Sequence, residues 1–159
     1  MESMNTNGNA QAPRSAVFRT SRLLPFPPQQ VFEAFQDPEV LATWWGPDGF
    51  TNTFDTFEFR SGGRWTFVMH GPDGSHHSND SVFLEVHAPL KIVIQHQSQP
   101  HFVLTVTLAA HGDGTEVTWN QAFEDRQVAA RIRHIVEPAN EQNLDRLGAA
   151  LARRSPPAT

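Results

Sequence analysis

The sequence predicts an α+β domain in which a curved antiparallel sheet of about seven strands wraps around one long C-terminal helix. Apolar residues recur at steps of three, four and seven between Asp125 and Arg153, which is the pattern of an amphipathic helix. At about 1.5 Å per residue this helix would be roughly 40 Å long, so it needs a broad apolar partner. The strand-rich middle of the chain is the only candidate for that partner, and its short turns make neighbouring strands antiparallel.

The elements follow one another in a simple order. The first strand is expected over Ala16–Leu24 and ends at the proline-rich segment 25–28. Two short helices come next: one covers Gln29–Phe35, and the other begins at Pro38, where Asp37 can cap it. Turns rich in glycine and proline then separate six further strands, over residues 53–59, 64–70, 76–87, 91–97, 102–110 and 115–123.

The last helix contains one proline, Pro138. Proline lacks a backbone N–H and clashes with the carbonyl group four residues before it, which costs about 3 kcal/mol in a helix interior. We therefore expect either a kink near His134–Pro138 or two helices that meet there, with Pro138 in the first turn of the second. The sequence leaves both arrangements open.

Length and composition limit the classes of protein. The 159 residues suit one domain, expected over residues 15–153, with a disordered arm at 1–14 and a flexible tail at 154–159. The absence of cysteine excludes thiol catalysis, disulfides and thiolate metal sites. A net charge of −5 argues against a nucleic-acid-binding surface. Without a long apolar run or an apolar signal region, we expect no membrane span and a cytoplasmic location.

Several motifs together resemble one known family. They include Pro28–Phe35, the Trp44–Pro47 segment, Arg60–Trp65 and the ending Asn140–Leu147. With these the chain resembles the START-like superfamily, also called SRPBCC or the helix-grip fold, over about residues 16–152. Within it the chain is similar to the bacterial branch named after the activator of heat-shock protein ninety ATPase. The resemblance implies a deep cavity between sheet and helix that binds apolar or amphipathic small molecules, but it implies no single function.

Alternation along the strands predicts which side chains face such a cavity, because residues two apart share a face. Aromatic and aliphatic residues dominate the expected inner face, with His96 and Gln121 as isolated polar groups. Such a wall is typical of a small-molecule pocket, although the same side chains could simply fill a core. The candidate ligand-binding residues are Trp44, Trp45, Phe67, Met69, Ile94, His96, Phe102, Trp119, Gln121 and Ile135.

Two clusters allow more than one interpretation. Trp44 and Trp45 could form an aromatic lip over the cavity mouth, or one could plug the core while the other caps a loop. His70, His76 and His77 lie close in sequence, but the adjacent pair points to opposite faces of a strand. A metal site needs three or four converging ligands, so we expect neither a metal nor another cofactor.

Three functions remain open. The first is binding of an apolar or amphipathic small molecule by a monomer or homodimer. The second is an enzyme of the cyclase, dehydratase or hydrolase type on a cavity-bound substrate, with His96 as acid or base beside Asp80 or Glu85. The third is a chaperone-linked or stress-response interaction module, which an extensive exposed apolar patch would favour. The sequence leaves open whether there is turnover.

Overall fold

The computed structural model describes residues 16–154. The predicted arm, residues 1–14, and residues 155–159 of the predicted tail lie outside the described part. The elements are β1 (Val17–Leu24), α2 (Pro28–Gln36), α3 (Pro38–Trp44), β2 (Thr51–Phe57), β3 (Arg64–His70), β4 (His76–His87), β5 (Lys91–His96), β6 (Phe102–His111), β7 (Gly114–Phe123) and α4 (Arg126–Arg154).

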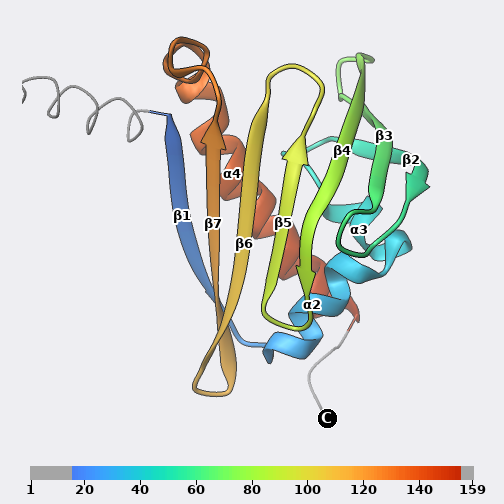
Figure 1. Ribbon diagram of the computed structural model, residues 1–159. Helices are drawn as coiled ribbons and strands as arrows, with labels where there is room; N and C mark the ends of the chain where they lie inside the picture. The colour runs from blue at the N-terminus through green and yellow to red at the C-terminus, as the bar shows by residue number, and fades with distance from the viewer. Residues whose placement is uncertain (1–15, 155–159) are drawn as a thin grey trace, which may run out of the picture.

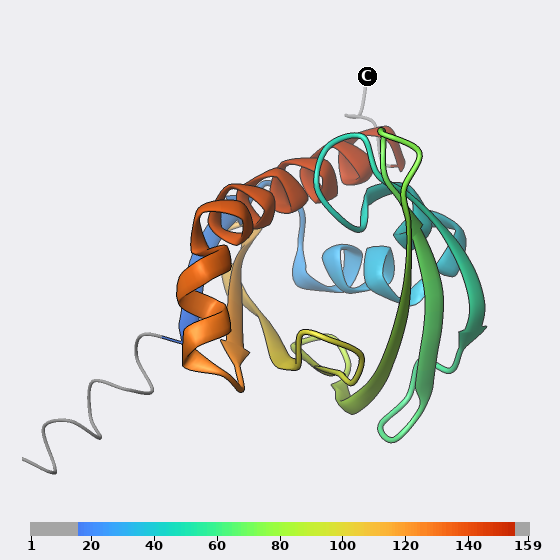
Figure 2. The same cartoon turned by 90° about the horizontal axis from the view of Figure 1, so that it is seen from above.

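All seven strands form one antiparallel sheet in the order β1-β7-β6-β5-β4-β3-β2. Strands β2 to β7 follow one another as hairpins, whereas β1 pairs with β7, so that Val17 lies opposite Ala122. The sheet curves, and α4 runs across its concave side from the β1 edge toward β2, with α2 and α3 at one end (Figures 1 and 2). The predicted helix-grip architecture is confirmed.

Helix α4 is continuous from Arg126 to Arg154, with Pro138 inside it. Asp125 caps its first turn, because its Oδ1 accepts hydrogen bonds from the backbone N–H of Gln127 at 2.8 Å and of Val128 at 3.2 Å. Figure 2 shows that the helix is bent rather than straight. Of the two expected arrangements, the structure therefore has the single kinked helix. No helix of residues 16–154 is long and apolar enough to cross a membrane.

The core is predominantly aromatic and aliphatic. Trp65 is 1% exposed and stacks against Phe67 and Phe83, with ring centroids 4.4 Å and 5.6 Å apart. Burial alternates along β7, where Trp119 and Gln121 of the predicted inner face are buried, as are Thr115, Val117 and Phe123 in the same alternation. The last two turns of α4 bring Leu147 and Leu151 onto this core. The sheet and helix thus share one apolar interior, which positions the site described next.

Candidate ligand cavity

A cavity of about 320 Å³ lies between the concave face of the sheet and α4. Strands β3 to β7 and the loop after α3 supply most of its wall, and α4 closes it. The lining residues are mainly aromatic, aliphatic or neutral polar: Trp45, Gly46, Pro47, Phe67, Met69, His77, Ser78, Asn79, Ser81, Ile94, His96, Gln99, Pro100, Phe102, Leu104, Trp119, Gln121, Ala139, Asn140 and Asn143.

Eight of the ten candidate residues line this cavity. The structure places the other two elsewhere. Trp44 is fully buried below the cavity, where its indole N–H donates to the Ala34 carbonyl oxygen at 3.0 Å. Ile135 is 59% exposed and points away from the core. Its apolar neighbour Val136, about 100° further around the helix, packs against the cluster of Phe18 and Phe123 instead.

The two tryptophans therefore have different positions. Trp44 packs in the core against Phe35, with ring centroids 4.9 Å apart. Trp45 reaches the cavity and contacts Trp65 at 4.9 Å and Trp119 at 5.7 Å between ring centroids. The interpretation that one tryptophan plugs the core is correct for Trp44, while Trp45 forms part of the wall.

His96 lies at the end of β5 and is only 8% exposed. Its Nδ1 donates to the Pro100 carbonyl oxygen at 2.8 Å, and its Nε2 lies 2.6 Å from Oδ1 of Asn79. The ring also stacks on Phe102, with centroids 4.5 Å apart. Burial lowers the pKa of His96, and hydrogen bonding to the Pro100 backbone partly opposes this effect. The imidazole is thus held by protein groups on both nitrogens.

The structure does not form the expected pair between His96 and a carboxylate. Asp80 is exposed, and Glu85 binds His87 and Lys91 at 3.0 Å and 3.3 Å. Because strand residues alternate between faces, Asp80 lies on the opposite face of β4 from the buried Ser81. The nearest side chain to Nε2 of His96 is therefore the neutral amide of Asn79, with the Ser98 hydroxyl at 3.3 Å.

Several polar lining residues were missed from the sequence. His77, Asn79 and Ser81 follow the inner face of β4, two residues apart and in phase with buried Phe83. That alternation was the signal that could have identified them. On α4, Asn140 and Asn143 also line the cavity, although polar residues within a helix give no such signal.

The loop after α3 is fastened to α4 by one arginine. The guanidinium group of Arg146 donates at 2.8 or 2.9 Å to the carbonyl oxygens of Thr43, Gly46, Pro47 and Phe50. Burial lowers the pKa of Arg146, which shows that part of its hydration is lost. The loop carries Trp45, so this arginine fixes one wall of the cavity.

Asn143 fastens the same loop from inside the cavity. Its Oδ1 accepts from the Gly46 N–H at 3.2 Å, and its Nδ2 donates to the Trp44 carbonyl oxygen at 2.9 Å. Gly46 has a φ of 99°, and a Cβ there would stand 2.6 Å from the Met69 side chain. Both constraints favour glycine at this position.

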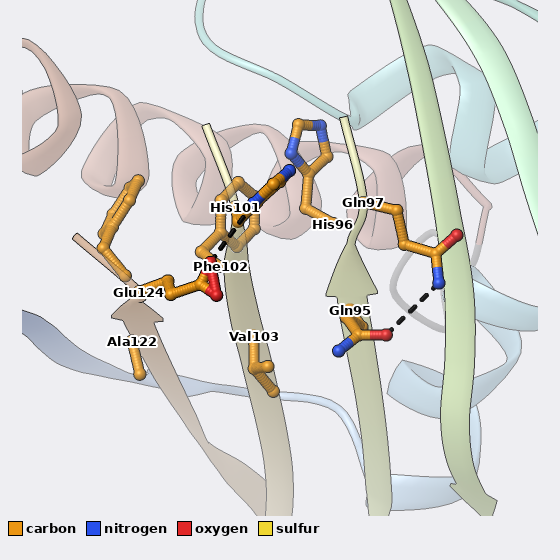
Figure 3. Close-up of a pocket in the computed structure, with 9 residues that line it drawn as sticks. Gln95, His96, Gln97, His101, Phe102, Val103, Ala122 and Glu124 are labelled. Atoms are coloured by element: carbon orange, nitrogen blue, oxygen red, sulfur yellow. Dashed lines mark hydrogen bonds and ion pairs between the residues drawn. The ribbon is translucent and has the colours of Figure 1, made fainter. Parts of the chain in front are cut away.

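A second hollow, of about 440 Å³, lies outside the sheet at the ends of β5, β6 and β7. Figure 3 shows its side chains, including the Gln95–Gln97 hydrogen bond and the contact between His101 and Glu124. It is more open than the interior cavity and is lined by a mixture of polar and apolar side chains. His96 and Phe102 border both spaces. The interior cavity is the better candidate because its wall is mainly apolar.

The histidines of the β3–β4 hairpin do not assemble a metal centre. Nδ1 of His70 lies 2.7 Å from Nδ1 of His76, while His77 lines the cavity rim. Within residues 16–154, no three histidine or carboxylate side chains converge as metal ligands.

Comparison with known proteins places the fold. The family described as Activator of Hsp90 ATPase homolog 1-like protein matches residues 25–152. A solution structure from Arthrobacter aurescens is similar, with a TM-score of 0.81 and 23% identity over 92% of this chain and 90% of that one. A crystal structure from Nitrosomonas europaea has a TM-score of 0.80 and 18% identity over 89% and 97% of the two chains.

A crystal structure from Chromobacterium violaceum is also similar, with a TM-score of 0.74 and 25% identity over 84% of this chain and 95% of that one. Comparison with curated protein sequences gives no significant match. The structural neighbours thus support the helix-grip fold, and the function has to be argued from the cavity.

Proposed function

Since the chain belongs to the family of activator of Hsp90 ATPase homolog 1-like proteins, we propose that it binds an apolar or amphipathic small molecule between the sheet and α4. The cavity carries the proposal: it measures about 320 Å³ and is walled by Trp45, Phe67 and Trp119. A mainly apolar wall with a few placed polar groups is the usual form of a small-molecule site. Such sites commonly span ~300–1,000 Å³.

The test uses the neutral dye N-phenyl-1-naphthylamine, whose fluorescence rises in apolar surroundings. Ala139 lines the cavity from α4, so Ala139→Leu should fill part of it and weaken dye binding at least about tenfold. Ala130→Leu makes the same change at an exposed position of the same helix and serves as the control. The parent protein and the control should bind one dye molecule each. Equal binding by all three proteins would contradict the proposal.

Binding is favoured over the two other hypotheses by particular observations. Both ring nitrogens of His96 are engaged by Asn79 and Pro100, so a substrate would have to displace one of them before His96 could act as acid or base. The exposed large hydrophobic side chains of the described residues are Leu23, Leu84, Leu90 and Ile135; Leu84 and Leu90 belong to one hairpin, and the other two lie on β1 and α4. An interaction module would present a broader apolar patch.

A further inference from the structure

We infer that the cavity selects an uncharged ligand carrying a hydrogen-bond donor and acceptor side by side, such as a carboxamide or lactam on an aromatic frame. The inference rests on the proposed function and narrows its ligand class. Two features carry it. One is that the described residues of the wall include no carboxylate, ammonium or guanidinium group. The other is a pair of amide side chains, Gln121 on β7 and Asn140 on α4, here called the amide pair.

Among residues 16–154, no aspartate, glutamate, lysine or arginine lines the cavity. Its titratable lining groups are two histidines. His77 is exposed at the rim, where its Nε2 contacts the Ser75 hydroxyl at 3.1 Å. His96 has both ring nitrogens engaged, and burial favours its neutral form. A carboxylate or ammonium group inside would lose its hydration without gaining a counter-ion, so charged ligands are disfavoured.

The amide pair is only half satisfied by the protein. Asn140 Nδ2 donates to Gln121 Oε1 at 3.0 Å. Gln121 Nε2 and Asn140 Oδ1 make no hydrogen bond with other residues of the described part. Gln121 is 8% exposed, so bulk water has little access to it. Both residues line the cavity, so the pair has one donor group and one acceptor available to a ligand there, although Asn140 also borders an outer hollow between β1 and α4.

This pattern does not depend on how the amide atoms are assigned. Exchanging N and O in both side chains reverses the direction of their shared hydrogen bond. It again leaves one NH₂ group and one carbonyl oxygen facing the cavity. A carboxamide matches them, because its oxygen can accept from one member of the amide pair while its N–H donates to the other.

The remaining wall offers aromatic surface and a neutral hydroxyl group. Trp45 and Trp119 stand 5.7 Å apart between ring centroids, and Phe67 and Phe102 add further aromatic surface. Ser81 is 3% exposed, and its hydroxyl has no hydrogen-bond partner within residues 16–154. A hydroxyl group can rotate to donate or to accept a hydrogen bond. The Ser81 hydroxyl therefore offers a ligand one further neutral hydrogen-bonding group.

The test compares four naphthalenes of the same size and shape as competitors of N-phenyl-1-naphthylamine at neutral pH. They are 2-naphthamide, 2-acetylnaphthalene, 2-isopropenylnaphthalene and 2-naphthoate. The first offers a hydrogen-bond donor and an acceptor, the second an acceptor alone, the third neither, and the fourth a negative charge. We expect 2-naphthoate to compete at least about tenfold more weakly than 2-naphthamide, because its charge would be buried without a partner.

Variants then test the amide pair itself. Gln121→Met keeps the side-chain length but removes the amide, and Asn140→Leu does the same from α4. In each, the preference for 2-naphthamide over 2-acetylnaphthalene should fall about tenfold relative to the parent, the scale of one hydrogen bond. Gln95→Met makes the matched change on a side chain outside the cavity and should leave the preference unchanged.

The outcomes separate this inference from the proposed function. If the dye does not bind in the cavity, both fail. If the dye binds but 2-naphthoate competes as well as 2-naphthamide, the selection of uncharged ligands is wrong. If the preference for 2-naphthamide is the same in the parent and in both variants, the amide pair does not recognise the ligand.

Discussion

Replacing Arg146 with methionine should destabilise the protein strongly, because one side chain satisfies four carbonyl oxygens at 2.8 or 2.9 Å. A hydrogen bond to a charged group contributes ~1.5–3 kcal/mol, so a simple sum would give about 6–12 kcal/mol. Part of that is offset, because the guanidinium group loses hydration and water can reach the freed carbonyls of an outer loop. We expect a loss of about 3–4 kcal/mol, close to the usual cost of breaking a buried charged network.

The assay is urea unfolding followed by tryptophan fluorescence. Arg131→Met, at an exposed position of the same helix, controls for the loss of an arginine, since arginine and methionine have similar helix propensities. Arg146→Lys should recover less than half of the lost stability. The lysine ammonium group lacks the planar, forked set of N–H donors with which the guanidinium group reaches several carbonyl oxygens. If Arg146→Met and Arg131→Met agree within about 0.5 kcal/mol, the loop does not depend on these hydrogen bonds and the reasoning fails.

Three further predictions use other parts of the molecule. Phe83→Ala should cost about 3–5 kcal/mol in urea unfolding, because Phe83 is 1% exposed and stacks on Trp65. Arg22→Ala should cost under about 1 kcal/mol, since its ion pairs with Glu141 and Asp145 are partly exposed, and high salt should reduce the effect. The His96 ring should titrate by NMR below the ordinary pKa of about 6.5, because it is buried.

Each of these three predictions has a control or a result that would contradict it. Leu84→Ala changes the next residue of β4, which is 41% exposed, and should cost far less than Phe83→Ala. An Arg22→Ala effect that grows with salt would contradict its ionic origin. His96→Gln identifies the His96 signal by removing it. As the pH falls, His96 takes up a proton in the unfolded chain at a higher pH than in the folded chain, so the free energy of unfolding should decrease below about pH 6.5. A titration midpoint of the folded His96 ring above that pH would contradict this account.

The fold was predictable because its signals are local and repeated. The alternation of Trp119 and Gln121 with their neighbours identified the inner face of β7, and the same rule identified Phe67 and Ile94 on other strands. Helical spacing is less selective, since two adjacent apolar positions can both face inward, as Ala150 and Leu151 do, or only one of them can. That is why Ile135 was assigned to the cavity although Val136 packs inward.

The cavity's polar contacts could not be predicted in the same way. They join residues far apart in the chain, such as Gly46 with Asn143 and Gln121 with Asn140. Nothing in the local pattern around an asparagine says which backbone group it will bind. The motif Asn140–Leu147 was recognised as typical of the family, but its role in fastening a loop emerges only from the contacts of Arg146.

The pairing of β1 with β7 has a consequence during synthesis on the ribosome. Ala122 is translated roughly a hundred residues after its partner Val17. At ~5–20 residues per second, β1 of the nascent chain has no strand to pair with for about 5–20 s. The loop that carries Trp45 likewise lacks its hydrogen bonds to Arg146 until roughly a hundred further residues have been translated. A ligand therefore finds no closed cavity until α4 has emerged, so it can stabilise the finished domain but cannot guide the earlier steps of its folding.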